Sequence, residues 1–158
     1  MRLALAAMAL LAAPAALADE ATVREGLVRG CFAGLPDFSA TAASLAALGW
    51  QTGPGASATE AEARKETVNV FINTGDSFNS PGCTVMSGDV PVPAARALLE
   101  QQLDRGFAGK WRTAPGHGGS KSWVVPGQGA SLVMYVLGGG NSGEGPGSGI
   151  SLSVRRDN

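Results

Sequence analysis

Helical and strand-like patterns follow one another along this chain without regular alternation. Two helical patterns come first, at about 21–31 and 37–48, and a third lies at 93–105. Strand-like patterns occupy the rest, at 67–73, 83–87, 109–113, 121–125, 131–137 and 149–156. Because a doubly wound parallel sheet needs strands and helices in alternation, this order excludes it. We expect a single α+β domain of order α-α-β-β-α-β-β-β, with an antiparallel sheet of about five strands and two or three helices packed on one face.

The helix at 93–105 has the clearest sequence pattern. Pro93 suits a first helical turn, and Gly106 ends the pattern. Leu98, Leu99 and Leu103 fall on one stripe. The pattern predicts that these leucines pack against the sheet.

Two segments predict loops. Residues 52–65 are small and polar and contain Gly53-Pro54-Gly55, which predicts a loop with at most one exposed helical turn. Residues 138–149 are mostly glycine, which orders at a high entropic cost and offers few side-chain contacts in return. We expect a flexible glycine-rich loop at 138–149 that joins the last two antiparallel strands and is not a binding loop.

Residues 1–18 have the pattern of a secretory signal peptide. Arg2 provides the positive start, Leu3 to Leu11 form an apolar run, and Pro14 breaks it. Ala16-Leu17-Ala18 matches the small-x-small cleavage pattern, so the mature domain is expected to be 19–158. The apolar run is shorter than the roughly 20 residues that span a bilayer, and no later run is longer. The pattern predicts a periplasmic or secreted chain whose mature form does not insert into a membrane.

The chain has two cysteines, Cys31 and Cys83. In an oxidising compartment an even count favours a disulfide, and only one intramolecular pairing exists. Reactive thiols are the alternative. The spacing fits no metal motif, and the single histidine does not complete a zinc site. We therefore predict a disulfide and no metal.

Composition and charge exclude some classes of protein. The chain of 158 residues is 44% hydrophobic and 16% charged, which is enough apolar content for a folded core. Its formal net charge of −1 lacks the basic excess that phosphate neutralisation requires. We expect no nucleic-acid partner.

The sequence contains no convincing catalytic or cofactor motif. A Gly-x-Gly-x-x-Gly pattern occurs at Gly138, Gly140 and Gly143, but no helix can follow it to hold a pyrophosphate, so no cofactor is predicted. Serine-hydrolase, zinc-protease and P-loop signatures are absent from the sequence. His117, between glycines, reads as a loop residue, and no catalytic residue is assigned. A catalytic role for it would need a carboxylate such as Asp76 or Asp89 beside it.

Basic and aromatic residues gather in the predicted strands after the third helix. They are Lys110, Trp111, Arg112, Lys121 and Trp123. Together they would form a surface for an acidic partner or a saccharide. Core packing is the alternative for the two tryptophans, and it is favoured because tryptophan in a strand of a small domain is usually buried.

These observations predict a small exported protein without enzymatic activity. Its expected role is a binding or envelope accessory module with a protein partner in the cell envelope. The alternative is a small hydrolase or transferase that uses His117 with an acidic partner.

Overall fold

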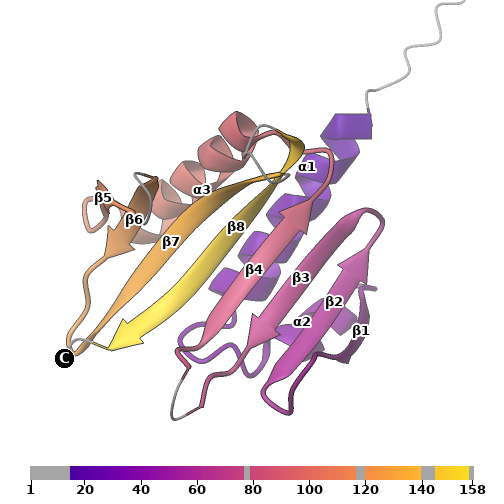
Figure 1. The fold of residues 1–158 in the computed structure, drawn as a ribbon, viewed down its shortest axis with the longest axis horizontal. Helices are drawn as coiled ribbons and strands as arrows, with labels where there is room; N and C mark the ends of the chain where they lie inside the picture. The colour runs from indigo at the N-terminus through magenta and orange to yellow at the C-terminus, as the bar shows by residue number, and fades with distance from the viewer. Residues whose placement is uncertain (1–14, 77–78, 117–119, 140–144, 157–158) are drawn as a thin grey trace, which may run out of the picture.

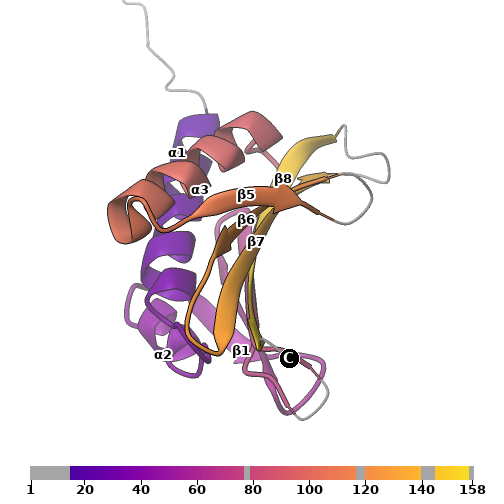
Figure 2. The ribbon, with the colours of Figure 1, turned by 90° about the vertical axis from the view of Figure 1, so that its left-hand side faces the viewer.

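The structure, a computed structural model, describes residues 15–76, 79–116, 120–139 and 145–156. It has two layers, a sheet and a set of helices that all lie on one side of it (Figures 1 and 2). The helical layer contains α1 (Ala15–Glu25), a π-helical continuation η1 (Gly26–Phe32), α2 (Thr41–Ala46) and α3 (Val92–Phe107). The α+β class with helices on one face is as the sequence predicted.

The described residues form eight strands in one antiparallel sheet of order β1-β2-β3-β4-β8-β7-β6-β5. The strands are β1 (Gln51–Pro54), β2 (Glu60–Lys65), β3 (Val68–Asn73), β4 (Gly82–Ser87), β5 (Arg112–Pro115), β6 (Lys121–Val125), β7 (Ala130–Gly139) and β8 (Gly145–Arg156). β1 to β4 form one meander and β5 to β8 another, and the two meanders meet where β4 pairs with β8.

The hydrophobic core lies between the sheet and the helices. α1 and η1 contact β4, α2 contacts β1 and β2, and α3 contacts β7 and β8. Strand positions alternate, so one face of β3 and β4 buries its apolar side chains while the other faces away from the helices. The largest fully buried side chains include Trp123, Phe38, Leu27, Leu45, Leu99 and Leu103. The predicted leucine stripe of α3 is confirmed, because Leu98, Leu99 and Leu103 are all buried.

The predicted disulfide is present. Cys31 of η1 is joined to Cys83 of β4, with their Cα atoms 5.5 Å apart. Both residues are almost fully buried. The bond therefore attaches the first part of the helical layer directly to a central strand.

The sheet has eight strands, not about five, because the expected loop at 52–65 contains the hairpin β1–β2. The reason lies in the small side chains of β2. Ala61 and Ala63 face the helices while Glu60 and Glu62 face the other way, and Ala63 is 1% exposed. The segment therefore alternates like a strand, but alanine and glutamate both have low strand propensity and hide the pattern.

Both edges of the sheet are short and end in proline. β1 ends at Pro54 and β5 ends at Pro115, and each strand has four residues that are mostly exposed. Proline lacks the N–H group that a further strand would need, so it discourages edge-to-edge pairing. The strand predicted at 109–113 begins later than expected, at Arg112. It follows a turn in which Gly109 has a φ of 71°.

The strands β7 and β8 extend into the glycine-rich segment at 138–149, which was expected to be a loop throughout. β7 extends to Gly139 and β8 begins at Gly145, so the strands occupy much of 138–149, and residues 140–144 lie outside the described residues. Gly147 packs so closely that an added Cβ would lie 2.6 Å from the carbonyl oxygen of Ser87. Ser148 is buried and donates a hydrogen bond to the carbonyl oxygen of Val90 at 2.6 Å. Here glycine permits close approach of two backbones, which composition alone does not indicate.

The first two predicted helices differ in extent from the observed ones. The first begins earlier, at Ala15, and becomes π-helical from Gly26, where Ala33 N donates to Val28 O at 3.2 Å. The second begins only at Thr41, after Phe38, which is fully buried and has a non-helical φ of 60°. Among the described helices, none is both long and apolar enough to cross a bilayer.

Candidate functional site

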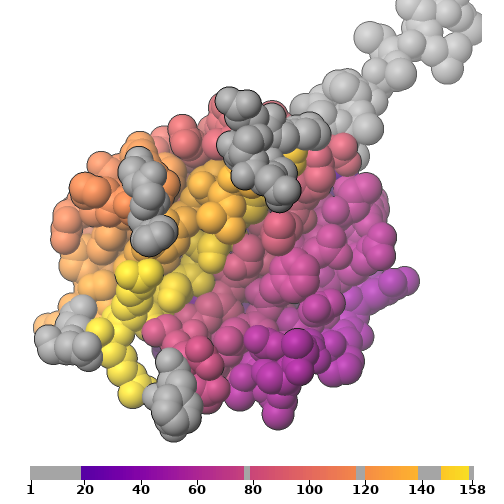
Figure 3. Space-filling model, viewed as in Figure 1, coloured from indigo at the N-terminus to yellow at the C-terminus, as the bar shows by residue number. Residues whose placement is uncertain are grey.

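Among the described residues, every helix lies on one face of the sheet and none covers the opposite face. In Figure 3, which views the molecule from this side, the colours of the strands, from magenta through orange to yellow, make up most of the surface. The cross-strand register aligns one row of side chains over this face, from Glu62 through Phe71, Thr84 and Ser151 to Tyr135. We call this surface the helix-free face.

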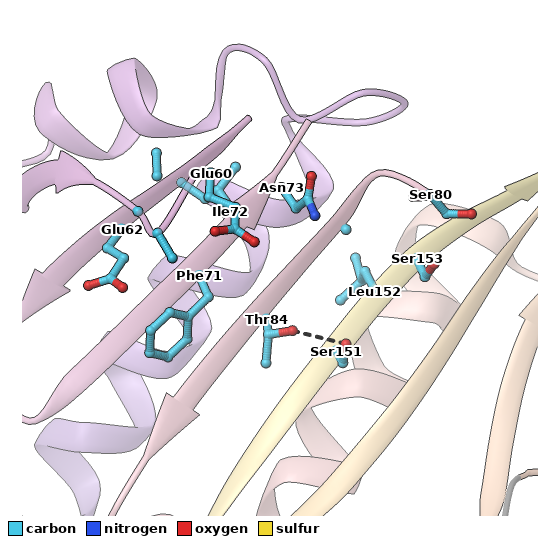
Figure 4. A pocket seen from close by; sticks show the side chains of 14 residues that line it. Glu60, Glu62, Phe71, Ile72, Asn73, Ser80, Thr84, Ser151, Leu152 and Ser153 are labelled. Atoms are coloured by element: carbon cyan, nitrogen blue, oxygen red, sulfur yellow. Dashed lines mark hydrogen bonds between the residues drawn. The ribbon is translucent and has the colours of Figure 1, made fainter. Parts of the chain in front are cut away.

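The helix-free face contains a hollow of about 410 Å³ over β2, β3, β4 and β8. Figure 4 shows the side chains that line it, which include Glu60, Glu62, Phe71, Asn73, Thr84 and Ser151. Its floor is the sheet itself, where Thr84 donates a hydrogen bond to Ser151 at 2.9 Å. The hollow therefore combines two carboxylates, one aromatic ring and several small polar groups.

The two carboxylates of the hollow come from one strand. Glu60 and Glu62 are two positions apart in β2, so they project from the same face. The register places Glu60 beside Asn73 and Glu62 beside Phe71 of β3. Arg64, the next residue on that face of β2, donates instead to the carbonyl oxygen of Glu66 at 3.4 Å. Of the described residues that line the hollow, none is basic.

Three large apolar side chains are exposed on the helix-free face. Phe71, Met86 and Leu137 are 41%, 42% and 46% exposed. Met86 and Leu137 flank Gly149 of β8, and an added Cβ there would lie 3.3 Å from Met86 Cγ and 3.7 Å from Leu137 Cβ. Phe71 lies one strand farther, beside Thr84. We call Phe71, Met86 and Leu137 the apolar trio.

One basic residue of the helix-free face, Arg155, lies toward the end of β8 that is remote from Gly149. Arg155 of β8 donates a hydrogen bond to the hydroxyl oxygen of Tyr135 at 2.9 Å, and its guanidinium lies 5.7 Å from the centroid of that ring. The face therefore has Glu60 and Glu62 on β2, with Met86 and Leu137 beside one end of β8 and Arg155 toward the other end.

The predicted basic and aromatic surface is not assembled. Trp123 is fully buried, and its indole N–H donates to Glu100 of α3 at 3.0 Å. Lys121 forms an ion pair with the same carboxylate at 3.1 Å and lies 4.9 Å from the Trp123 ring. Burial raises the pKa of Glu100, but the hydrogen bonds from Trp123 and Lys121 outweigh it, so the pKa is lowered overall. These two predicted residues therefore join the sheet to α3.

The remaining members of that predicted surface lie near the end of α3. Trp111 is half-buried and donates to Asp104 at 3.0 Å, while Lys110 and Arg112 are exposed. They do not approach the hollow, which lies on the opposite side of the sheet from α3 (Figures 1 and 4). Core packing explains Trp123, and no shared site emerges from the five residues.

His117, on which the catalytic alternative depends, lies outside the described residues. Of its two suggested carboxylate partners, Asp76 accepts hydrogen bonds from Asn79. Asp89 has a raised pKa because of its hydrogen bond with Asp19, its partial desolvation and the charge of that neighbour. In the described part of the chain, no three His, Cys, Asp or Glu residues are grouped to hold a metal ion.

Sequence reasoning missed every residue of the hollow. One signal was available, because residues 60–63 alternate Glu-Ala-Glu-Ala, which places both glutamates on one face if the segment is a strand. Comparisons with protein-family models, with curated proteins and with solved structures found no match to this chain.

Proposed function

We propose that this chain is an exported protein of the cell envelope, without enzymatic activity, that binds a protein partner through its helix-free face. The observation that carries the proposal is the exposed apolar trio of Phe71, Met86 and Leu137 on a sheet face that none of the described helices covers. Single exposed apolar residues are ordinary, but a group of large ones on one face commonly marks an interaction surface.

The charge pattern of the face favours a protein over a lipid or an anionic polymer. The hollow beside the trio is lined by Glu60 and Glu62, which repel phosphate and carboxylate groups. A protein surface can present a cation to the two glutamates and an acidic or neutral group to Arg155 of β8.

The sheet edges favour binding to the face and not strand addition. Pro54 and Pro115 end the two edge strands and remove N–H donors that an added strand would need. The partner is therefore expected to lie across the strands, in contact with side chains.

Export is supported by the sequence pattern of residues 1–18 and agrees with the disulfide, since such bonds persist mainly in oxidising compartments. Cleavage after Ala18 keeps the residues that anchor α1. Asp19 is 6% exposed and accepts a hydrogen bond from Thr67 at 2.6 Å. Mass spectrometry of the exported chain is expected to find Asp19 as the first residue, and a retained leader would contradict export by this route.

The binding proposal is tested by cross-linking and co-purification of the tagged mature protein from its envelope fraction. The variant Phe71→Ser, Met86→Ser, Leu137→Ser is expected to lose the captured partner, because its apolar contacts are removed. The control Arg105→Ser changes an exposed residue of α3 on the other layer and is expected to retain it. Circular dichroism and the absence of free thiols establish that each variant is folded. A folded triple variant that keeps the same partner would contradict the proposal.

A further inference from the structure

We propose that the hollow bounded by Glu60, Glu62 and Phe71 receives a lysine or arginine side chain of the protein partner, with apolar partner residues covering Met86 and Leu137. This inference rests on the proposed function and specifies the chemistry of the partner.

The two carboxylates are available to a ligand. Glu60 and Glu62 have no ion-pair partner among the described residues, whereas Glu25 and Glu100 on the helix side each have a lysine within 3.1 Å. Arg64, the nearest cation along β2, is held by a backbone carbonyl oxygen. Two carboxylates on one strand face repel each other, and a cation placed between them relieves that repulsion.

The aromatic ring of Phe71 gives the hollow a second feature that suits a cation. Phe71 is the cross-strand partner of Glu62, so its ring and that carboxylate lie next to each other on the helix-free face (Figure 4). A guanidinium or ammonium group above an aromatic ring is attracted by the ring's negative face. The methylene stem of arginine or lysine also packs against apolar surface while its charge reaches a carboxylate.

The hollow adjoins the apolar trio, which identifies the rest of the partner segment. Phe71 belongs both to the hollow and to the trio, and Met86 and Leu137 follow across β4 and β7. Arg155 lies beyond Ser153 of the hollow, at the opposite end of β8 from Gly149, and disfavours a second cation at that end. The complementary segment therefore has one basic residue followed by apolar residues, and it lies across the strands.

The test uses two peptides and the ¹⁵N-labelled mature protein, with binding followed by NMR chemical shifts. The first peptide is acetyl-Arg-Leu-Leu-amide, and the second replaces arginine by citrulline, which has the same shape without the charge. We expect the arginine peptide to shift the amides of Glu62, Phe71 and Thr84 and to bind about tenfold more tightly than the citrulline peptide. The preference is expected to weaken as salt is added.

Matched variants distinguish binding at the two glutamates of the hollow from attraction of the peptide by the overall net charge. Glu60→Gln with Glu62→Gln is expected to abolish the preference for arginine. The control Glu20→Gln with Glu66→Gln makes the same change of net charge away from the hollow and is expected to retain it. Equal affinity for the two peptides, or the same loss in both variants, would overturn the proposal.

Other occupants give different results. Spermidine that shifts the same amides while the arginine peptide does not would show a small-cation site and overturn a protein occupant. A dimer of the mature protein, dissociated by substitution of the apolar trio, would show that a second copy covers the face and would also overturn it. If the Glu60→Gln, Glu62→Gln variant still captures the envelope partner and the apolar-trio variant does not, this inference fails while the proposed function stands. If both variants capture the partner, the proposed function fails too.

Discussion

The two halves of the molecule have the same layout but are held together differently. The first half runs from α1 to β4 and the second from α3 to β8, and in each a helical segment precedes a four-stranded antiparallel meander. The last strands of the two halves, β4 and β8, pair antiparallel at the centre of the sheet. This arrangement approximates a twofold relation perpendicular to the sheet.

The helical layers of the two halves differ in regularity. The second half has one 16-residue helix, α3, with a continuous leucine stripe. The first half has α1, the π-helical η1 and the six-residue α2. Short helices bury less apolar surface per element and are marginal on their own. The disulfide lies in the half whose helical layer is broken into short pieces, and it links that layer to β4.

Each half also contains a glutamate that joins its helix to a tryptophan and a lysine of the sheet side. Glu25 of α1 accepts from Trp50 Nε1 at 2.7 Å and from Lys65 Nζ at 2.7 Å. Glu100 of α3 accepts from the corresponding atoms of Trp123 and Lys121 at 3.0 Å and 3.1 Å. The same polar attachment therefore serves both halves, and the disulfide is the addition that distinguishes the first.

Removal of the disulfide is expected to have the largest effect. Cys31→Ala with Cys83→Ala frees a loop closed over 52 residues, which lowers the free energy of unfolding by about 4 kcal/mol on the loop-entropy model. Chemical denaturation measures the change, and hydrogen exchange is expected to rise first in η1 and β4. An unchanged free energy of unfolding would mean that packing alone holds the first half.

Leu99→Ala tests whether the second half depends on its leucine stripe. Leu99 is fully buried, so truncation is expected to cost about 3 kcal/mol through lost burial and a cavity. Arg96→Ala, on the exposed side of the same helix, is the control and is expected to leave stability nearly unchanged. Equal melting temperatures for the two variants would contradict the packing of α3 described above.

Gly147→Ala tests a contact between the two halves, where Gly147 of β8 packs against the backbone of Ser87 and Gly88 at the end of β4. An added Cβ would meet Ser87 O and Gly88, both backbone groups, so the variant is expected to lose about 2 kcal/mol by overpacking. Gly53→Ala in β1 has open space around the new Cβ and serves as the control. A Gly147→Ala protein as stable as the Gly53→Ala protein would show that β8 can shift at this point.

Glu25→Gln and Glu100→Gln compare the two attachments and have the smallest expected effect. Each is expected to cost about 1 kcal/mol at pH 7, because both carboxylates are partly exposed. The hydrogen bonds from Lys65 and Trp50 lower the pKa of Glu25 from 4.5. A carboxylate whose pKa is lower in the folded state than in the unfolded state stabilises the fold at pH values above its unfolded pKa. This stabilisation is lost as the pH falls through the folded pKa. The wild type and Glu25→Gln are therefore expected to differ at pH 7, and the difference is expected to shrink as the pH falls below 4.5 and through the lower pKa of the folded state. A difference that does not shrink as the pH is lowered would exclude the ionised carboxylate as its cause.

Several features of this protein follow from its sequence alone. The leucine stripe and flanking Pro93 and Gly106 define α3, because helical periodicity and end signals are local. Two cysteines allow one intramolecular pairing, and alternation identifies β3 as a strand with one buried face. These features depend on residues close together in the chain or on a count that leaves no choice.

The tertiary structure decided the rest. β1 and β2 are strands because they pair with β3, although their small and charged residues have weak strand propensity. Trp123 is buried because α3, about two dozen residues earlier, supplies Glu100 and an apolar surface. The hollow exists only because the register sets Glu62 beside Phe71 and Thr84 beside Ser151, residues up to 67 positions apart. Register between distant strands is selected by the packing of the whole sheet on its helices, and local sequence does not encode it.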